Sequence, residues 1–190
     1  NAIANICESV GADVEKVAKG VGLDRRIGKE FLKAGIGYGG SCFPKDVAAF
    51  IHLSEEVGYN FELLKVVEKI NEEQKNLVIK KAKELLWNLK GKTIGVLGIS
   101  FKPKTDDIRE SPAIEIIRKL LREGVAIKAF DPVATEEAKK ILPEITYCNL
   151  PSEVAENSDL SVILTEWSEF RELDWKRIKS RLRKPFLIDG

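Results

Sequence analysis

The sequence changes character at Thr93-Ile94-Gly95-Val96-Leu97-Gly98-Ile99, a short apolar run at residues 93–99. An apolar run of this length predicts a strand that is buried on both faces, as in a parallel sheet. The residues before the run carry helical patterns, whereas the residues after it alternate between strand and helix patterns. The run therefore marks the border between two parts of different architecture.

Residues 90–190 predict a parallel sheet covered by helices. Strand patterns follow at residues 126–130, 145–147, 160–165 and 186–188, and amphipathic helices at residues 112–122 and 135–141. Strands that alternate with helices are typical of a doubly wound α/β sheet. We therefore expect a Rossmann-like domain in this half of the chain.

Residues 1–89 predict an all-helical domain. Helices are expected at residues 2–10, 14–19, 44–57 and 61–89. Asp13 suits the N-cap of the second helix, Gly20 and Gly22 are expected to break it, and Pro44 suits the first turn of the third. At about 1.5 Å per residue the last helix is longer than a small domain is wide, so we expect it to connect domains or to contact a partner chain.

The composition excludes several classes of function. Thirty-one basic and 30 acidic side chains leave a net charge of +1, so no global attraction to nucleic acid or to an anionic membrane is expected. No apolar run approaches the roughly 18 residues of a membrane span, and no secretory signal is seen. Three scattered cysteines fit a reducing cytoplasm better than a disulfide framework. The sequence contains no methionine, and we expect it to be a piece of a longer protein.

The strongest local signal for chemistry is the run Gly39-Gly40-Ser41-Cys42-Phe43-Pro44-Lys45-Asp46. A thiol just ahead of a Pro-initiated helix faces the positive end of that helix, and Lys45 adds a cation nearby. Both features favour the reactive thiolate. A lone cysteine is more often a buried structural residue. The surrounding glycines, proline and charges favour Cys42 as a nucleophile instead, and Asp46 could order a water molecule or a neighbouring cation.

Three motifs in this order resemble the UDP-glucose and GDP-mannose dehydrogenases. The run FLKAGIGYGGSCFPKD (residues 31–46), preceded by DRRIG (residues 24–28), is similar to the catalytic loop of that family. The run GISFKPKTDDIRESP (residues 98–112) is similar to its C-terminal signature, and LTEW (residues 164–167) to a further family element. The resemblance covers essentially the whole chain.

The resemblance implies a four-electron oxidation of a sugar C6 hydroxyl to a carboxylate with NAD as the cofactor. Cys42 would attack the intermediate aldehyde to form a thiohemiacetal and then a thioester, and Asp46 would help water to cleave it. The substrate expected is UDP-glucose, and the assembly expected is a dimer or a higher oligomer of identical chains. The Gly-rich NAD-binding domain of the family would precede this chain, so we expect the chain alone to be inactive.

The resemblance also implies contacts for the substrate and the cofactor. Substrate contacts fall on Arg26, Phe31, Leu32, Lys33, Gly35, Tyr38, Gly39, Phe43, Phe101 and Lys102, with Arg26 reaching into the site of the neighbouring subunit. Lys45 and Arg109 match residues near the cofactor phosphates, and no metal site is expected. Without the resemblance, Phe101 and Lys102 would be interpreted as a strand-end aromatic and a solvated lysine, and both arginines as surface ion pairs.

The second half of the chain is expected to bind the UDP of the substrate rather than NAD. Gly95-Val96-Leu97-Gly98 lacks the GxGxxG spacing of a dinucleotide site, and Asp131 at the end of the next strand is only suggestive of a ribose-binding carboxylate. The expected nucleotide site is the crevice at the carboxyl edge of the sheet.

Three alternatives stay open at this point. GDP-mannose dehydrogenases share the GGSC run, so GDP-mannose or another nucleotide sugar competes with UDP-glucose as the substrate. A non-catalytic UDP-binding or assembly module would use the same nucleotide crevice without the Cys42 chemistry. A helix-turn-helix DNA-binding protein is disfavoured, because acidic residues interrupt the basic face of residues 2–31.

Overall fold

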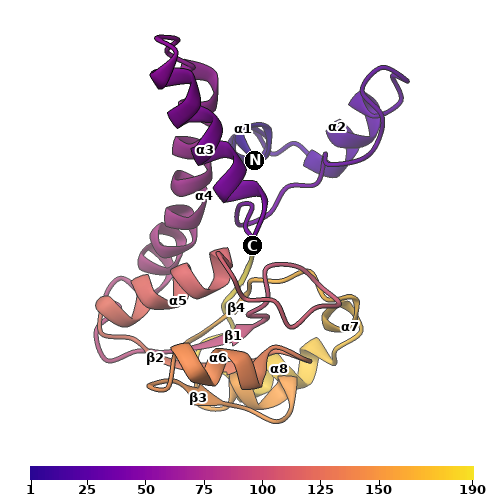
Figure 1. Cartoon of the computed structure of the whole chain (residues 1–190). Coiled ribbons are helices and arrows are strands. Elements are labelled where there is room, and N and C mark those ends of the chain that lie inside the picture. Colours follow the sequence, from indigo (N-terminus) through magenta and orange to yellow (C-terminus); the bar gives the residue numbers. More distant parts are fainter.

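The computed structural model describes residues 1–190 and contains one five-stranded sheet (Figure 1). The strands are β1 (Thr93–Leu97), β2 (Ala126–Phe130), β3 (Thr146–Tyr147), β4 (Leu160–Ile163) and β5 (Leu187–Asp189). All four pairings are parallel, and the spatial order is β3-β2-β1-β4-β5. The predicted parallel α/β sheet is therefore confirmed, with each strand within two residues of its expected bounds.

β1 is the central strand, and its apolar side chains are buried from both sides. Ile94 pairs in register with Ile127 of β2 and with Leu160 of β4. Ile94, Val96 and Leu97 are fully buried, as the continuous apolar run predicts. The chain proceeds outward from β1 in one direction through β2 and β3 and in the other through β4 and β5. The order reverses between β1 and β4, which is where sheets of this type form a crevice at their carboxyl edge.

Nine helical segments surround or precede the sheet. They are α1 (Ala2–Val10), α2 (Val14–Val21), α3 (Phe43–Glu56), α4 (Glu62–Leu86), α5 (Pro112–Arg122), α6 (Thr135–Ile141), the 3-10 helix η1 (Pro151–Ala155), α7 (Ser168–Arg171) and α8 (Trp175–Arg181). Asp13 caps α2 as predicted, since its carboxylate accepts from the N–H groups of Glu15 and Lys16. None of these helices combines the length and apolar character that a membrane span requires.

Some expected helix bounds were wrong, for local reasons. α2 passes through Gly20 and ends at Gly22, because one glycine weakens a helix without stopping it. α4 ends at Leu86, three residues before its expected end, where Trp87 takes a left-handed φ of 65°. η1 and α7 were not predicted, because five and four residues are too few to show a period of 3.6. α8 was also missed, although it has the same seven-residue length as α6, which was predicted.

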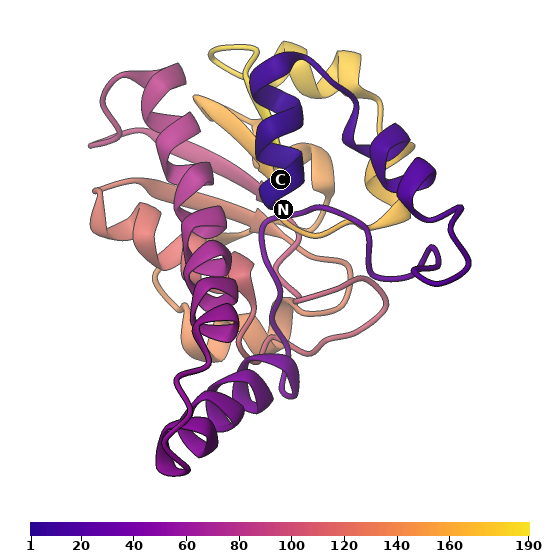
Figure 2. The same ribbon diagram turned by 90° about the horizontal axis from the view of Figure 1, so that it is seen from above.

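α4 connects the N-terminal helices to the sheet (Figures 1 and 2). The second half of α4 buries Val78, Ile79, Ala82 and Leu86 in the same apolar core as the sheet strands and α5. By contrast, α1, α2 and α3 together bury only Cys7 and Ser54. The sheet and α4 thus form the densely packed part of the chain, and the first three helices stand outside it.

Ion pairs between α4 and α5 reinforce this packing. Lys75 contacts Glu72 at 2.7 Å on its own helix and Glu115 on α5, and Lys119 of α5 contacts Glu72 in return. Burial raises the pKa of Glu72, but hydrogen bonds from Lys119 and Lys75 outweigh burial and lower this pKa to about 2. Glu72, Lys75 and Asn76, from the polar stretch that interrupts the apolar pattern of α4, therefore face α5.

Gly95 gives η1 room to pack on the centre of the sheet. A Cβ at Gly95 would lie 2.3 Å from the carbonyl oxygen of Val154, which is backbone and cannot move aside easily. We expect Gly95→Ala to reduce the free energy of unfolding by about 1–3 kcal/mol through overpacking. Gly20→Ala is the matched control: no atom lies within 4 Å of its Cβ, so a gain of about 0.5–1 kcal/mol is expected. Urea unfolding measures both, and an unchanged midpoint for Gly95→Ala would contradict the packing of η1.

Glu72 should make the stability of the chain dependent on acid pH. Its pKa is about 2 in the folded chain against 4.5 ordinarily, so its contribution is complete above roughly pH 4.5 and is lost as the pH falls towards 2. Because 48% of its side chain is exposed, solvent screening limits the contribution to about 1 kcal/mol. Urea midpoints of Glu72→Gln and the unmodified protein should therefore differ at neutral pH and converge in acid. Glu73→Gln, which loses only an exposed contact of 3.8 Å to Lys69, is the control. A difference that stays constant with pH would refute the role of Glu72.

Candidate active site

The glycine-rich stretch predicted to wrap a ligand is an extended loop between α2 and α3 that lies against the segment between β1 and α5. A Cβ at Gly39 would lie 2.1 Å from the carbonyl oxygen of Glu110, and a Cβ at Gly40 would lie 2.8 Å from the Phe101 ring. The Gly40 N–H also donates to the carbonyl oxygen of Arg109 at 3.1 Å. Only glycine allows the two backbones to approach so closely. The structure thus joins the loop before Cys42 to the C-terminal signature.

Cys42 lies at the end of this loop, at the N-cap position of α3. Its thiol is exposed and makes a hydrogen bond with the Ser41 hydroxyl at 3.7 Å. Pro44 occupies the first turn of α3, as predicted. Cys42 therefore stands at the N-terminal, positive end of a 14-residue helix, and its side chain makes no capping hydrogen bond. A nucleophile at this position is accessible to a substrate from solvent.

Three charged groups lie around the cysteine loop. Lys45 and Asp46, both in the first turn of α3, are exposed and 3.7 Å apart. Arg109 is exposed and donates two hydrogen bonds to Asp107, which raise the pKa of its guanidinium, with a further contribution from the nearby Cys42. The ion pairs of Lys45 and Arg109 are open to solvent, so both cations can exchange their present partners for a phosphate.

Tyr38 and Phe43, which precede and follow Cys42 in the sequence, have aromatic rings in contact, with centroids 5.3 Å apart. Across the loop, the Lys102 ammonium lies 5.1 Å from the centre of the Phe101 ring. Phe101 is half-buried and Lys102 is exposed, so the ring packs under the cysteine loop while the charge faces outward. The structure therefore brings together Tyr38, Gly39, Phe43 and Phe101 around the Cys42 loop, with the Lys102 charge beside them.

Asp131 holds the carboxyl edge of the sheet together. One carboxylate oxygen accepts hydrogen bonds from the N–H groups of Ile99 and Ser100, at 2.7 and 3.0 Å, and lies 3.4 Å from the indole nitrogen of Trp167. The other oxygen accepts from the N–H groups of Val133 and Ala134. Asp131 is only 3% exposed, so its carboxylate has no free face for a ribose. This arrangement disfavours a dinucleotide site here and explains why Phe101, two residues after Ile99, is held in place.

A cleft of about 700 Å³ lies beside the other end of the glycine-rich loop. The loop contributes Leu32, Lys33 and Gly35 to its wall, and α1, α2, α4 and the end of β5 supply most of the rest. The Lys33 ammonium lies 3.3 Å from the Glu166 carboxylate, which follows β4. Three of the predicted substrate residues therefore line a cleft that does not include Cys42.

Phe31 and Arg26 lie apart from the cysteine. Phe31 is 94% exposed and has a φ of 58°, which is rare for a bulky residue. The Arg26 guanidinium is exposed and makes its hydrogen bonds with Asp24, the shortest at 2.6 Å. This pairing raises the pKa of Arg26 and lowers that of Asp24. Within one chain, neither side chain reaches the thiol through a hydrogen bond or an ion pair.

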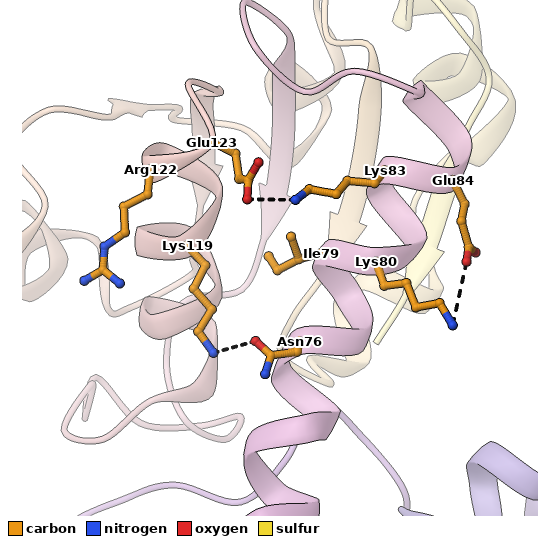
Figure 3. A pocket seen from close by; sticks show the side chains of 8 residues that line it. All are labelled: Asn76, Ile79, Lys80, Lys83, Glu84, Lys119, Arg122 and Glu123. Carbon is orange, nitrogen blue, oxygen red and sulfur yellow. Dashed lines mark hydrogen bonds and ion pairs between the residues drawn. The ribbon is translucent and has the colours of Figure 1, made fainter.

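A second hollow, of about 600 Å³, lies between α4 and α5 (Figure 3). Its lining is almost entirely polar, but its charges are largely paired with one another. Lys83 contacts Glu123 at 2.8 Å, and Lys119 donates to Asn76 at 2.8 Å. We interpret this surface as part of the joint between the two helices and assign the chemistry to the Cys42 loop.

The chain fits only part of the expected cofactor. Lys45 and Arg109 present two exposed cations near the thiol, which suits the phosphates of NAD. The carboxylate that would hold a ribose, Asp131, is fully used by the main chain and Trp167. The residues for the rest of the dinucleotide are therefore not supplied by this sheet.

Asn71 contacts the cysteine loop, and the sequence did not predict this contact. It lies on α4 and binds the main chain of Tyr38 through two hydrogen bonds. The available signal was the polar stretch at residues 71–76, which interrupts the apolar pattern of α4. That pattern shows which residues face away from the core but cannot say what they bind.

Comparison with known proteins agrees with this arrangement. Residues 1–73 match the central domain of the UDP-glucose/GDP-mannose dehydrogenase family, and residues 95–190 match its UDP binding domain. The chain is 48% identical to UDP-glucose 6-dehydrogenase TuaD of Bacillus subtilis and 46% identical to UDP-glucose 6-dehydrogenase YwqF of the same organism. Both matches cover 100% of this chain but only 41% and 43% of the relatives. The chain thus spans less than half the length of these curated relatives.

Solved structures show the same likeness. A UDP-glucose dehydrogenase from Pyrobaculum islandicum superposes with a TM-score of 0.93 at 37% identity, over 100% of this chain and 43% of that chain. A GDP-mannose dehydrogenase from Pseudomonas aeruginosa gives a TM-score of 0.71 at 27% identity, over 97% of this chain and 44% of that chain. Three observations indicate the same family: the two matched domains, the cysteine loop and the parallel sheet. The chain therefore belongs to the UDP-glucose/GDP-mannose dehydrogenase family.

Proposed function

We propose that this chain supplies the nucleophile and the nucleotide-sugar site of an NAD-dependent UDP-glucose 6-dehydrogenase, which makes UDP-glucuronate. The observation that carries the proposal is the exposed Cys42 thiol at the N-terminus of α3, on a loop packed against the UDP-binding half of the chain. UDP-glucose is favoured as the substrate because the relatives that match the whole chain at 45–48% identity are named UDP-glucose 6-dehydrogenases.

Cys42 explains how one site can carry an alcohol to a carboxylate. NAD, when bound, accepts the two hydrides of this four-electron oxidation. The Cys42 thiolate adds to the C6 aldehyde left by the first oxidation, which forms a C–S bond and a thiohemiacetal. Loss of the second hydride gives a thioester. The sulfur of Cys42 thus serves first as the attacking group and later as the leaving group.

Water completes the reaction. Attack of water on the thioester carbonyl breaks the C–S bond, releases the sugar carboxylate and regenerates the thiol. Asp46 lies one turn into α3 from Cys42, and its exposed carboxylate is available to orient this water. Lys45 and Arg109 would neutralise phosphates beside the thiol.

The UDP would bind where Phe101 and Lys102 meet the glycine-rich loop. The loop from Phe31 to Gly40 would donate main-chain N–H groups to the nucleotide sugar. Phe101 would stack against an apolar face of the nucleotide, and Lys102 would bind its phosphate. Leu32, Lys33 and Gly35 would bind through the adjoining cleft. Because Asp131 cannot bind a ribose, we expect NAD to be bound by another domain and this chain alone to be inactive.

We also propose an assembly of identical chains in a reducing compartment, the cytoplasm. All three cysteines are free, and a reducing environment would keep Cys42 a thiol. Large apolar side chains on α3, including Phe50 and Leu53, are more than half exposed, as expected for a helix that a second chain covers. Arg26 would then serve the site of the neighbouring subunit.

Cys42→Ala in the complete protein should abolish formation of UDP-glucuronate, because no thioester can form. Cys42→Ser is the informative companion, since its hydroxyl is a poorer nucleophile and leaving group, and we expect turnover to fall by about 10³-fold or more. Product formation measured by chromatography, with UDP-glucose binding as the folding control, tests both. Normal turnover by Cys42→Ala would refute the nucleophile assignment and favour the hypothesis of a non-catalytic UDP-binding module.

The stoichiometry of reduced cofactor should distinguish the substrate and the extent of oxidation. Titration of the complete protein with limiting UDP-glucose and excess NAD should yield about two NADH per sugar, because the oxidation removes four electrons. GDP-mannose should yield none. Turnover of GDP-mannose alone would preserve the role of Cys42 but change the substrate, whereas one NADH per UDP-glucose would mean that the reaction stops at the aldehyde.

A further inference from the structure

Asn71 pairs with the main chain of the cysteine loop in the way that a neighbouring strand would. The Tyr38 N–H donates to the Asn71 Oδ1 atom at 2.7 Å, and the Asn71 Nδ2 atom donates to the Tyr38 carbonyl oxygen at 3.2 Å. Only a carboxamide offers an acceptor and an N–H donor side by side, so no charged or hydroxyl side chain of this size can replace both bonds. One side chain on α4 therefore satisfies both polar groups of Tyr38.

The loop is shaped to permit this pairing. Gly37 has a φ of 120°, and a Cβ there would lie 2.6 Å from the Asn71 Oδ1 atom. A side chain at position 37 would therefore push the loop away from α4. The close approach of Gly37 and the two hydrogen bonds of Asn71 are thus parts of one arrangement.

This contact lies only four residues before the thiol. Tyr38 is held by Asn71, and two residues later Gly40 is held by the Arg109 carbonyl oxygen and the Phe101 ring. The Tyr38 ring also contacts Phe43, immediately after Cys42. The position of the thiol relative to the C-terminal half therefore depends on where α4 holds Tyr38.

We propose that Asn71 is a positioning residue, which holds the Cys42 loop in the geometry that presents the thiol to the substrate. Its effect on turnover rests on the proposed function, whereas its effect on the exposure and reactivity of Cys42 does not. Asn71 acts through Tyr38 and does not itself touch the reacting atoms.

Three variants of the complete protein separate this role from simple packing. Asn71→Ala removes both hydrogen bonds. Asn71→Asp keeps the shape and the acceptor but loses the donor, and its ionised carboxylate faces the Tyr38 carbonyl oxygen. Asn76→Ala is the matched control, because Asn76 is an exposed amide on the same helix that bonds Lys119 instead.

Each variant is measured by kcat and KM with UDP-glucose at saturating NAD, and by the rate at which iodoacetamide alkylates Cys42, followed on the Cys42 peptide by mass spectrometry. For Asn71→Ala we expect kcat to fall about tenfold or more through misplacement of the thiol. The alkylation rate should change in the same variant and should not change in Asn76→Ala.

Asn71→Asp tests the donor by itself. Because the ordinary pKa of an aspartic acid is about 3.9, its carboxyl is ionised at neutral pH and cannot donate to the Tyr38 carbonyl oxygen. We expect kcat to fall in Asn71→Asp at least as far as in Asn71→Ala, and the alkylation rate of Cys42 to change in both.

Unchanged kcat and alkylation in Asn71→Ala would overturn the proposal. Unchanged kcat and alkylation in Asn71→Asp would also overturn it, because the second hydrogen bond would then have no role, and this variant remains informative if Asn71→Ala does not fold. Failure of the proposed function looks different: Cys42→Ala would keep its turnover, while the alkylation rates would still report the position of the loop.

Discussion

The rest of the structure depends on the burial of one helix. The second half of α4 lies in the core of the parallel sheet, through Val78, Ala82 and Leu86. Its first half extends beyond the sheet and carries Asn71, which binds the cysteine loop. Because a helix is stiff over this length, fixing one half in the core also fixes the other. α4 thereby positions the thiol relative to the sheet half of the chain.

The ion pairs between α4 and α5 further constrain the position of the cysteine loop relative to the sheet. α5 begins at Pro112, directly after the segment on which Gly39 and Gly40 rest. Glu72, Lys75, Glu115 and Lys119 couple the two helices one turn beyond Asn71. The cysteine loop is thus held from two sides by elements that are themselves joined. Asp131 completes the frame, since its buried carboxylate holds the end of β1 just before Phe101.

Much of the fold could be predicted because its signals are local. Each strand is a short apolar run, and the longer helices show a period of 3.6 residues, so their bounds fell within a few residues of those observed. The helices η1 and α7 were missed because they contain too few residues to show a period, and α8 was missed although it is as long as α6. In the candidate site, the motif is continuous: it contains the glycines, Cys42, Pro44 and the neighbouring charges. Because these residues are consecutive, the sequence alone could predict a nucleophile there. The resemblance implied only that residues of that motif, and Phe101 and Lys102, contact the substrate, whereas the direct contact of the loop with residues 101–110 appeared in the structure.

The sequence by itself determined the parallel α/β sheet, the helix that begins at the cysteine motif and the identity of the candidate nucleophile, because each depends on residues close together in the chain. Only the tertiary structure decided how those parts meet. It showed that Asp131 is occupied by main-chain N–H groups, that Asn71 binds Tyr38, and that Lys33 pairs with Glu166 across 133 positions. Hydrogen bonds between residues far apart in the chain produce no periodic pattern in a single sequence. The residue type also does not show whether a side chain is exposed or paired. The physical reason is that partners are chosen by packing in three dimensions, which local pattern does not encode.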